Sequence, residues 1–245
     1  MRNPAVRGAF VVVLTLFTLA AAVPGRAQDA LTPLDTELSD AELDRRIRFI
    51  EQRLDASRTH GRIWYWSWMT VNAGSAVVQG AIAASIDNHD DRVNLATNAA
   101  LGAIGVADLM LRPLQARHGA DPIRELPETS RDERIAKLRA AEDRLRRNAD
   151  RAAERTSWEV HAGNAALAAA AGTLVGLWGN PSDGVITGAA ALAGGEINIW
   201  TQPAAPRRDW QDYRAMVGGR ADLATVAVYI DRFEDGVKGG LRLGW

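Results

Sequence analysis

The sequence contains no cysteine, and this absence excludes several kinds of chemistry. No disulfide can form, so the folded chain is held together by packing and by non-covalent polar contacts. Thiol catalysis, thiolate zinc sites and lipid attachment to an N-terminal cysteine are excluded on the same ground. An oxidising compartment is tolerated without a disulfide framework.

Recognisable catalytic motifs are also missing. No serine lies in a Gly-x-Ser-x-Gly turn, and neither a phosphate-binding glycine loop nor a His-Glu-x-x-His helix occurs. One polar segment holds metal-ligand residue types, but we interpret it as a solvated turn because its second copy retains only Asp183. The residues of that segment are Asp87, His89, Asp90 and Asp91. The sequence therefore predicts a non-enzymatic protein without catalytic, cofactor-binding or metal-binding residues.

Proline is absent from two long stretches, between Ser39 and Arg112 and between Ser130 and Asn180. Because proline breaks helix interiors, its absence favours long helices in both stretches. Each stretch opens with Ser-x-x-Glu, in which the serine caps a helix and the glutamate reaches back to the cap residue. We therefore predict an all-α fold.

The two stretches resemble each other, which predicts a tandem duplication. The offset is 91 residues at the opening serines (130 minus 39) and one residue less further along the chain. Tryptophan, proline and arginine recur as well as alanine: Trp68 with Trp158, Pro113 with Pro203, and Arg117 with Arg207. We divide the chain into linker 28–38, first repeat 39–117, linker 118–129, second repeat 130–208 and C-terminal segment 209–245.

Each predicted repeat is a charged helix followed by a hairpin of two helices rich in small residues. Apolar residues recur in the charged helices at steps of three and four, so each has one apolar face that pairs with the other or with another chain. These residues are Leu43, Ile47, Ile50, Leu54, Ile135, Leu138 and Leu145. Turn formers at 87–92 and 179–183 mark the hairpin tips. The four apolar helices are expected near 69–86, 93–112, 159–178 and 184–202, in a helical bundle.

The first 27 residues have the pattern of a secretory signal peptide. Two arginines precede the apolar run 9–23, which is shorter than the ~20 residues of a membrane span, and Gly25 and Ala27 suit a cleavage site. Removing residues 1–27 takes away three arginines and no acid, so the formal charge changes from −1 to 26 minus 30, which is −4. We expect an exported protein, periplasmic or membrane-associated, with no nucleic-acid partner.

Aromatic residues are scarce inside the apolar helices and gather at their ends. None occurs between Met69 and Arg112, and Trp178 is the only one between Glu159 and Ile199. The candidate interface aromatics are Trp64, Trp66, Trp68, Trp158, Trp178 and Trp200. This distribution resembles the aromatic belt of membrane proteins, where closely spaced small residues also pack helices together.

Other features favour a water-soluble bundle. A carboxylate such as Glu196 is costly if it faces lipid, and an exported chain would place its arginine-rich helices opposite to the positive-inside tendency. The apolar helices also carry several polar residues: Asn72, Gln79, Asn94, Asn98, His161 and Asn164. We therefore prefer a soluble or peripherally attached bundle to membrane-embedded hairpins.

Asp108 and Glu196 are the candidate functional polar residues, each near the end of the second helix of a hairpin. If buried, their carboxyl groups would have raised pKa values and could carry protons. The simpler interpretation is pairing with Arg112 or Arg207 on the helix surface.

The C-terminal segment fits two periods. A helical face and a strand-like alternation both occur within 221–235, and we prefer a short helix there, followed by an extended tail. The helical face comprises Leu223, Val226, Ala227, Ile230 and Phe233, whereas Val226, Val228 and Ile230 alternate. Alternation continues at Val237, Leu241, Leu243 and Trp245.

These observations predict an exported, non-enzymatic helical scaffold or interaction protein of a bacterial-type cell envelope. Its partner would be another envelope protein or a second copy of the chain, and no cofactor is expected. The alternative is an integral membrane hairpin protein with a channel or transport role, in which Asp108 and Glu196 face the pathway.

Overall fold

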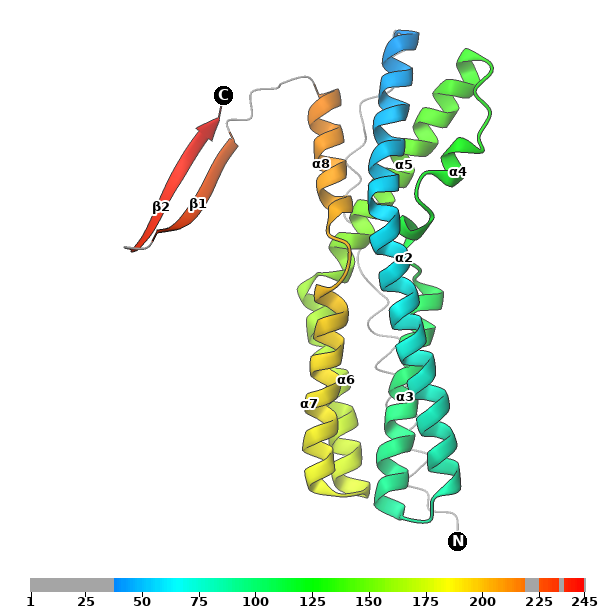
Figure 1. The fold of residues 1–245 in the computed structure, drawn as a ribbon, viewed down its shortest axis with the longest axis vertical. Helices are drawn as coiled ribbons and strands as arrows, with labels where there is room; N and C mark the ends of the chain where they lie inside the picture. Colours follow the sequence, from blue (N-terminus) through cyan, green and yellow to red (C-terminus); the bar gives the residue numbers. More distant parts are fainter. Residues whose placement is uncertain (1–37, 219–224, 234–235, 245) are drawn as a thin grey trace.

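The computed structural model describes residues 38–218 and the two strands of the C-terminal segment. The helices form an elongated bundle, which confirms the predicted all-α bundle (Figure 1). In chain order they are α2 (Asp40–Ser85), α3 (His89–Leu111), the 3-10 helix η1 (Gln115–His118), α4 (Asp121–Arg124), α5 (Arg131–Arg155), α6 (Trp158–Trp178), α7 (Pro181–Trp200) and α8 (Ala205–Val217). The predicted signal peptide lies outside the described residues.

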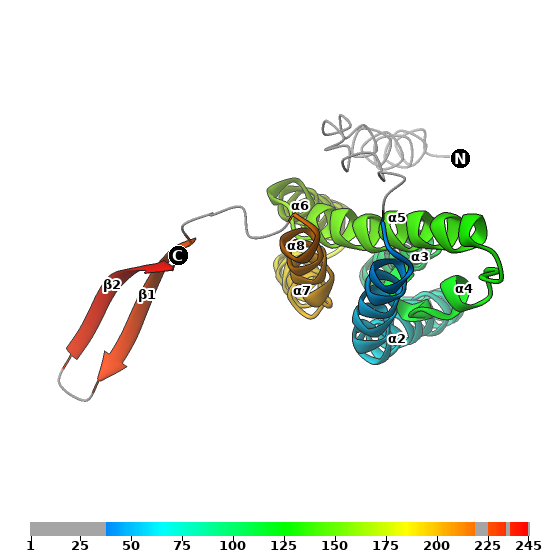
Figure 2. The ribbon, with the colours of Figure 1, turned by 90° about the horizontal axis from the view of Figure 1, so that it is seen from above.

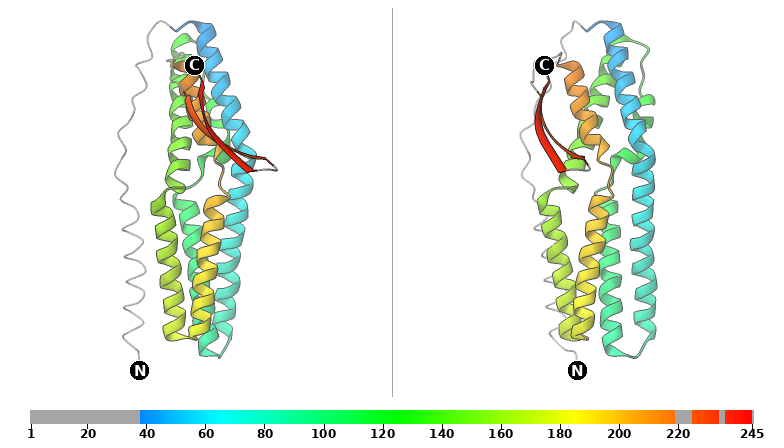
Figure 3. Two further views of the ribbon diagram at one scale, coloured as in Figure 1. Left: turned by 90° about the vertical axis from the view of Figure 1, so that its left-hand side faces the viewer. Right: turned by 60° about the vertical axis from the view of Figure 1, so that its left-hand side comes forward.

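The bundle has two halves along its length (Figures 1 and 3). One half contains the first part of α2 with α4, α5 and α8, and we call it the charged half (38–62, 112–157 and 201–218). The apolar half (63–111 and 158–200) contains the rest of α2 with α3, α6 and α7. Seen along the bundle axis, the apolar half is two neighbouring hairpins, α2 with α3 and α6 with α7 (Figure 2).

The predicted helix starts are present in the structure. The Ser39 hydroxyl accepts a hydrogen bond from the Glu42 N–H at 3.2 Å and begins α2. Ser130 begins α5 with a complete capping box, because its hydroxyl accepts from the Glu133 N–H while the Glu133 carboxylate accepts from the Ser130 N–H. Such caps satisfy backbone donors that a helix leaves unpaired at its start.

The two predicted repeats differ at the junction between the halves. In the first, the charged helix and the first hairpin arm are one continuous helix of 46 residues, α2. In the second, the chain breaks between α5 and α6, and Ser157 has the extended backbone of a helix N-cap. Threonine and serine at 156–157 favour such a break because their hydroxyls compete for backbone hydrogen bonds. The duplication itself stays a prediction.

The core of the charged half joins the predicted apolar faces. Leu43, Ile50 and Leu54 of α2 are buried in one cluster with Leu138 and Leu145 of α5. The faces therefore pair with each other within the chain, one of the two expected arrangements. Burying each such side chain contributes about 1.5–3 kcal/mol.

Helix α8 attaches to this core through buried polar contacts. The Tyr213 hydroxyl donates a hydrogen bond to the Glu142 carboxylate, and the Ser57 hydroxyl donates to Asp209 at 3.2 Å. Burial raises the pKa of Glu142 above its usual value, and it does the same for Asp209. Burial, together with the neighbouring Glu142 charge, also raises the pKa of Tyr213. Docking of α8 therefore places ionisable groups where their charged forms are disfavoured.

We expect Glu142→Gln to stabilise the protein at pH 7 and to lose this effect as the pH falls. A carboxyl group with a raised pKa is destabilising once it is ionised, whereas below about pH 4.3 it is protonated in both folded and unfolded chains. Glutamine keeps an acceptor for the Tyr213 hydroxyl at every pH. Thermal unfolding of the full-length protein, measured between pH 4 and pH 7, checks this. The exposed Glu125→Gln is the matched control, and a gain independent of pH would contradict the account.

The hairpin loops are shorter than predicted. Helix α2 ends at Ser85 and α3 begins at His89, so Asp90 and Asp91 belong to the first turn of α3. The Asn88 side-chain oxygen accepts from the N–H groups of both aspartates, at 3.0 and 3.3 Å. Capping by asparagine and acidic residues near a helix start are both favourable, which explains why the helix begins inside the predicted turn.

The preferred helix at 221–235 is wrong. The chain forms an antiparallel hairpin of β1 (Thr225–Phe233) and β2 (Gly236–Gly244), in which the Cα atoms pair Val226 with Leu243 and Val228 with Leu241. The strand-like alternation, and not the helical period, therefore matches the structure. β-Branched residues lose side-chain freedom in a helix and favour strands, and β1 is rich in them.

Candidate functional site

The exposed large apolar side chains are confined to the apolar half. Within residues 38–218, every one lies between residues 63 and 111 or between 158 and 200. Away from the tryptophans they include Val71, Val77, Val78, Ile82, Met110, Leu111, Leu177, Val185, Ile186, Leu192 and Ile197. Val77, for example, is 69% exposed although it lies in the middle of a hairpin helix. A contiguous apolar surface of this kind marks an interaction site or a membrane contact.

The interior of the apolar half is made mainly of small residues. Gly102, Ala168, Ala171, Gly184 and Thr187 are buried where the hairpin helices meet. Large side chains therefore point outward and small ones inward, the reverse of a water-soluble bundle and the pattern of helices that pack in lipid. By length and composition, α3 and α6 are each able to cross a membrane.

Several polar side chains of the apolar half form hydrogen bonds within one helix or between two helices. The Asn94 side-chain oxygen accepts from the Thr187 hydroxyl at 3.1 Å and from the Asn98 amide at 2.7 Å. The Gln79 amide donates to the Ser75 hydroxyl at 2.7 Å. The bond from Thr187 to Asn94 joins the two hairpins. Polar residues satisfied in this way are compatible with a lipid environment, because their groups do not face lipid unpaired.

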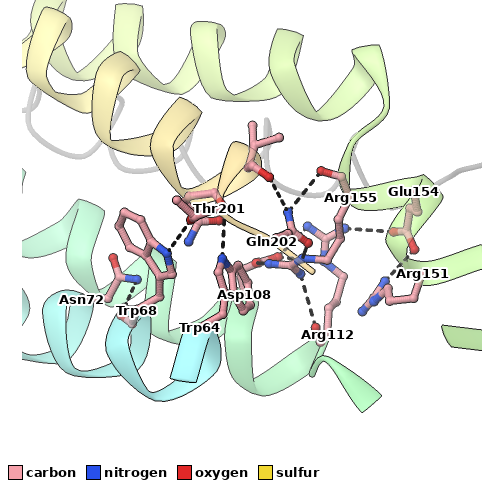
Figure 4. Close-up of polar contacts among 12 residues, drawn as sticks. Trp64, Trp68, Asn72, Asp108, Arg112, Arg151, Glu154, Arg155, Thr201 and Gln202 are labelled. Atoms are coloured by element: carbon pink, nitrogen blue, oxygen red, sulfur yellow. Dashed lines mark hydrogen bonds and ion pairs between the residues drawn. The ribbon is translucent and has the colours of Figure 1, made fainter. Parts of the chain in front are cut away.

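Asp108 lies in an ionic cluster at the junction between the halves (Figure 4). Its carboxylate accepts from Arg112 at 2.6 Å and from Arg155 at 2.8 Å. Arg155 is almost fully buried, its Nε donates to the Gln202 side chain at 3.1 Å, and its guanidinium lies 5.3 Å from the centre of the Trp64 ring. Asp108 is therefore paired with Arg112, as the simpler interpretation of the sequence predicts. Its second partner, Arg155, could not be inferred from the spacing of residues along one helix.

The ionic cluster around Asp108 connects helices from distant parts of the sequence. Asp108 is in α3, Arg155 ends α5, and Gln202 follows α7 (Figure 4). Removing one member of a buried, hydrogen-bonded ion pair leaves an uncompensated charge, which costs about 3–5 kcal/mol. The geometry therefore supports a structural role for Asp108 at the junction.

Glu196 lies in a different cluster, formed by α6 and α7. Its carboxylate contacts the His161 ring at 2.7 Å and accepts from the Asn164 amide at 3.0 Å and from the Trp200 indole at 3.2 Å. The ion-pair partner is thus His161, not the expected Arg207. Satisfying the carboxylate with three partners lowers the cost of placing it near lipid. The sequence shows His161 and Asn164 only as polar residues of an apolar helix, because their convergence on Glu196 depends on how α6 packs against α7.

The candidate interface tryptophans have two kinds of position. Trp64 is buried, and its indole donates to the Asn198 carbonyl at 3.1 Å, while the Trp68 indole donates to the Thr201 hydroxyl at 3.2 Å (Figure 4). These two fasten α2 to the end of α7. The exposed tryptophans at the junction are Trp66, Trp158 and Trp200, whereas Trp178 is exposed at the opposite tip.

A cleft in the charged half is lined by charged residues that sequence reasoning did not single out. Lys137 is buried there, and its ammonium group contacts Glu128 at 2.5 Å and Glu51 at 3.7 Å. An ammonium group paired in this way is not an available nucleophile. Within residues 38–218, no group of three or more histidine or acidic side chains is arranged to hold a metal ion.

No protein-family model, curated protein or solved structure matches the chain. The feature that distinguishes this molecule is the separation of an apolar, outward-facing half from a charged half with its own core.

Proposed function

We propose that the chain is an exported, non-enzymatic helical protein of the cell envelope whose apolar half is embedded in a lipid bilayer. The charged half then stands on the membrane surface as a scaffold for another envelope protein or for a second copy. The confinement of exposed large apolar side chains to one half carries this proposal. It favours embedding, which composition alone ranked second.

The dimensions of the apolar half suit a bilayer. At about 1.5 Å per residue, α3 with 23 residues is about 34 Å long and α6 with 21 residues is about 32 Å long. The hydrocarbon core of a bilayer is about 30 Å thick. No Asp, Glu, Lys or Arg occurs within 63–86, 93–107, 160–182 or 184–195. The charges that remain in the apolar half lie at its two ends.

One of the two objections from the sequence weakens against this geometry. The carboxylates of Asp108 and Glu196 are neutralised or hydrogen-bonded near the junction, so neither faces the bilayer centre unpaired. The other objection stands, because the positive-inside tendency is counted over loops of up to about 60 residues and the arginine-rich segment 112–157 is shorter than that. The proposed embedding therefore depends on the exposed apolar surface and not on the distribution of charge.

The channel or transport alternative receives less support from the polar residues that suggested it. Asp108 is occupied by two arginines and Glu196 by His161, Asn164 and Trp200, in separate clusters that share no residue. A conducting pathway needs polar groups that line one route between the helices.

Alkaline extraction of membranes tests the embedding. The full-length chain is produced in a bacterial host, export is checked by the N-terminal mass, and the membranes are washed at about pH 11. We expect the mature protein to stay in the pellet, because high pH strips proteins held by polar contacts and leaves those held by apolar surface in lipid. Release into the wash would overturn the proposed embedding.

A further inference from the structure

Arginine and aromatic side chains gather at the edge of the charged half, next to the apolar half. Arg62 is exposed on α2, one helical turn before Tyr65. The Arg117 guanidinium of η1 lies 4.0 Å from the centre of the Tyr65 ring, and exposed Trp66 packs edge-on against the same ring with centroids 5.3 Å apart. η1 approaches α2 this closely because residue 61 is glycine: a Cβ on Gly61 would lie 3.1 Å from the Arg117 nitrogen.

Arg144 of α5 contacts the same segment as Arg117, and Arg62 directly follows Gly61, which packs against the Arg117 backbone. We call these three residues the arginine cluster (Arg62, Arg117 and Arg144). The Arg144 Nε donates to the Gly119 carbonyl at 3.3 Å and its Nη2 donates to the Gln115 carbonyl at 3.4 Å, so part of its donor fork stays free. None of the three guanidinium groups hydrogen-bonds or ion-pairs with a carboxylate of residues 38–218. The cluster therefore carries positive charge that the fold does not neutralise by direct pairing.

His118 shows the effect of this charge. Burial and the charges of Arg117, Arg144 and Arg58 lower the pKa of His118 below its usual value, and only Asp121 opposes them. Asp121 is itself paired with Arg58 at 2.7 Å. The local field thus favours an anion at this edge of the charged half.

We propose that the arginine cluster binds the phosphate groups of anionic phospholipids at the membrane surface. The inference rests on the proposed embedding, which places the cluster at headgroup level. Along α2, Arg62 is about 9 Å from Trp68 and about 13 Å from Val71, the first exposed valine of the apolar half. Guanidinium groups match phosphate oxygens in geometry, and cationic side chains beside a membrane attract anionic lipids.

Lipid binding to the full-length protein in detergent micelles, followed by native mass spectrometry, tests the proposal. The probes are phosphatidylglycerol, phosphatidylcholine and inorganic phosphate. We expect phosphatidylglycerol to bind on the order of tenfold more tightly than phosphatidylcholine, and Arg62→Gln combined with Arg117→Gln to abolish this preference. Raising the salt concentration should weaken the preference by screening.

The control is Arg48→Gln combined with Arg139→Gln, which removes the same amount of positive charge from two exposed positions. Arg48 is about 20 Å from Arg62 along α2. The single variant Arg62→Gln is expected to fold, because the Arg62 side chain makes no hydrogen bond or ion pair within residues 38–218. This variant should lower the preference for phosphatidylglycerol several-fold.

Three results would overturn the proposal: equal binding of the two lipids, a preference that survives in the double variant, or displacement of the lipid by millimolar phosphate. Alkaline extraction distinguishes failure of the lipid site from failure of the embedding. If the protein stays in the membrane pellet but shows no lipid preference, only the lipid site is contradicted. If the protein is released into the wash, the embedding is contradicted as well.

Discussion

Gly184→Ala should separate α6 from α7 and destabilise the protein by about 2–3 kcal/mol, lowering the unfolding midpoint by roughly 5–10 °C. A Cβ at Gly184 would lie 2.5 Å from the Gly172 carbonyl oxygen and 2.6 Å from the Gly176 nitrogen. Both are backbone atoms of α6, so no rotation of a side chain relieves the clash. The helices must move apart, and the contacts of the second hairpin are lost with their separation.

Gly194→Ala is the matched control on the same helix. A Cβ there meets no atom within 4 Å, and alanine in an open helical position is more favourable than glycine by up to about 1 kcal/mol. We therefore expect opposite signs for the two substitutions when thermal unfolding of the full-length protein is followed in detergent. Equal stability of the two variants would show that α6 and α7 do not approach as closely as described.

Local rules in the sequence were sufficient for much of the fold. The serine caps of α2 and α5 and the apolar face from Leu43 to Leu54 follow from spacing and hydrogen-bonding chemistry within a few residues. The absence of proline indicated the long helices, although not the continuity of α2 through the junction. Residues 221–235 fit both a helical and a strand-like period. The β-branched residues of this segment favour the strand, which is the structure that forms.

The candidate site depended on contacts that spacing does not reveal. Asp108 and Arg155 are far apart in sequence, and they meet only because the end of α5 packs beside the end of α3. The same holds for His161 and Glu196, which converge across the α6–α7 interface. The outward orientation of Val77 was equally hidden, because helices with little segregation of apolar and polar residues do not show which face meets a neighbour.

Thiol labelling tests most directly whether the apolar half lies in lipid. Because the chain has no cysteine, a single introduced cysteine is its only thiol. Val77→Cys places it about midway between Trp68 and Ser85, on the exposed face of α2. Ala136→Cys, at an exposed position of α5 in the charged half, is the control.

Both variants are treated in open membrane fragments with a maleimide that does not enter lipid. The thiolate is the reacting form, and lipid excludes both the reagent and the charge, so we expect Val77→Cys to react at least about tenfold more slowly than Ala136→Cys. Denaturation in dodecyl sulfate should remove the difference. Equal labelling of the two cysteines in intact membrane fragments would contradict the account, because it would place the apolar half in water.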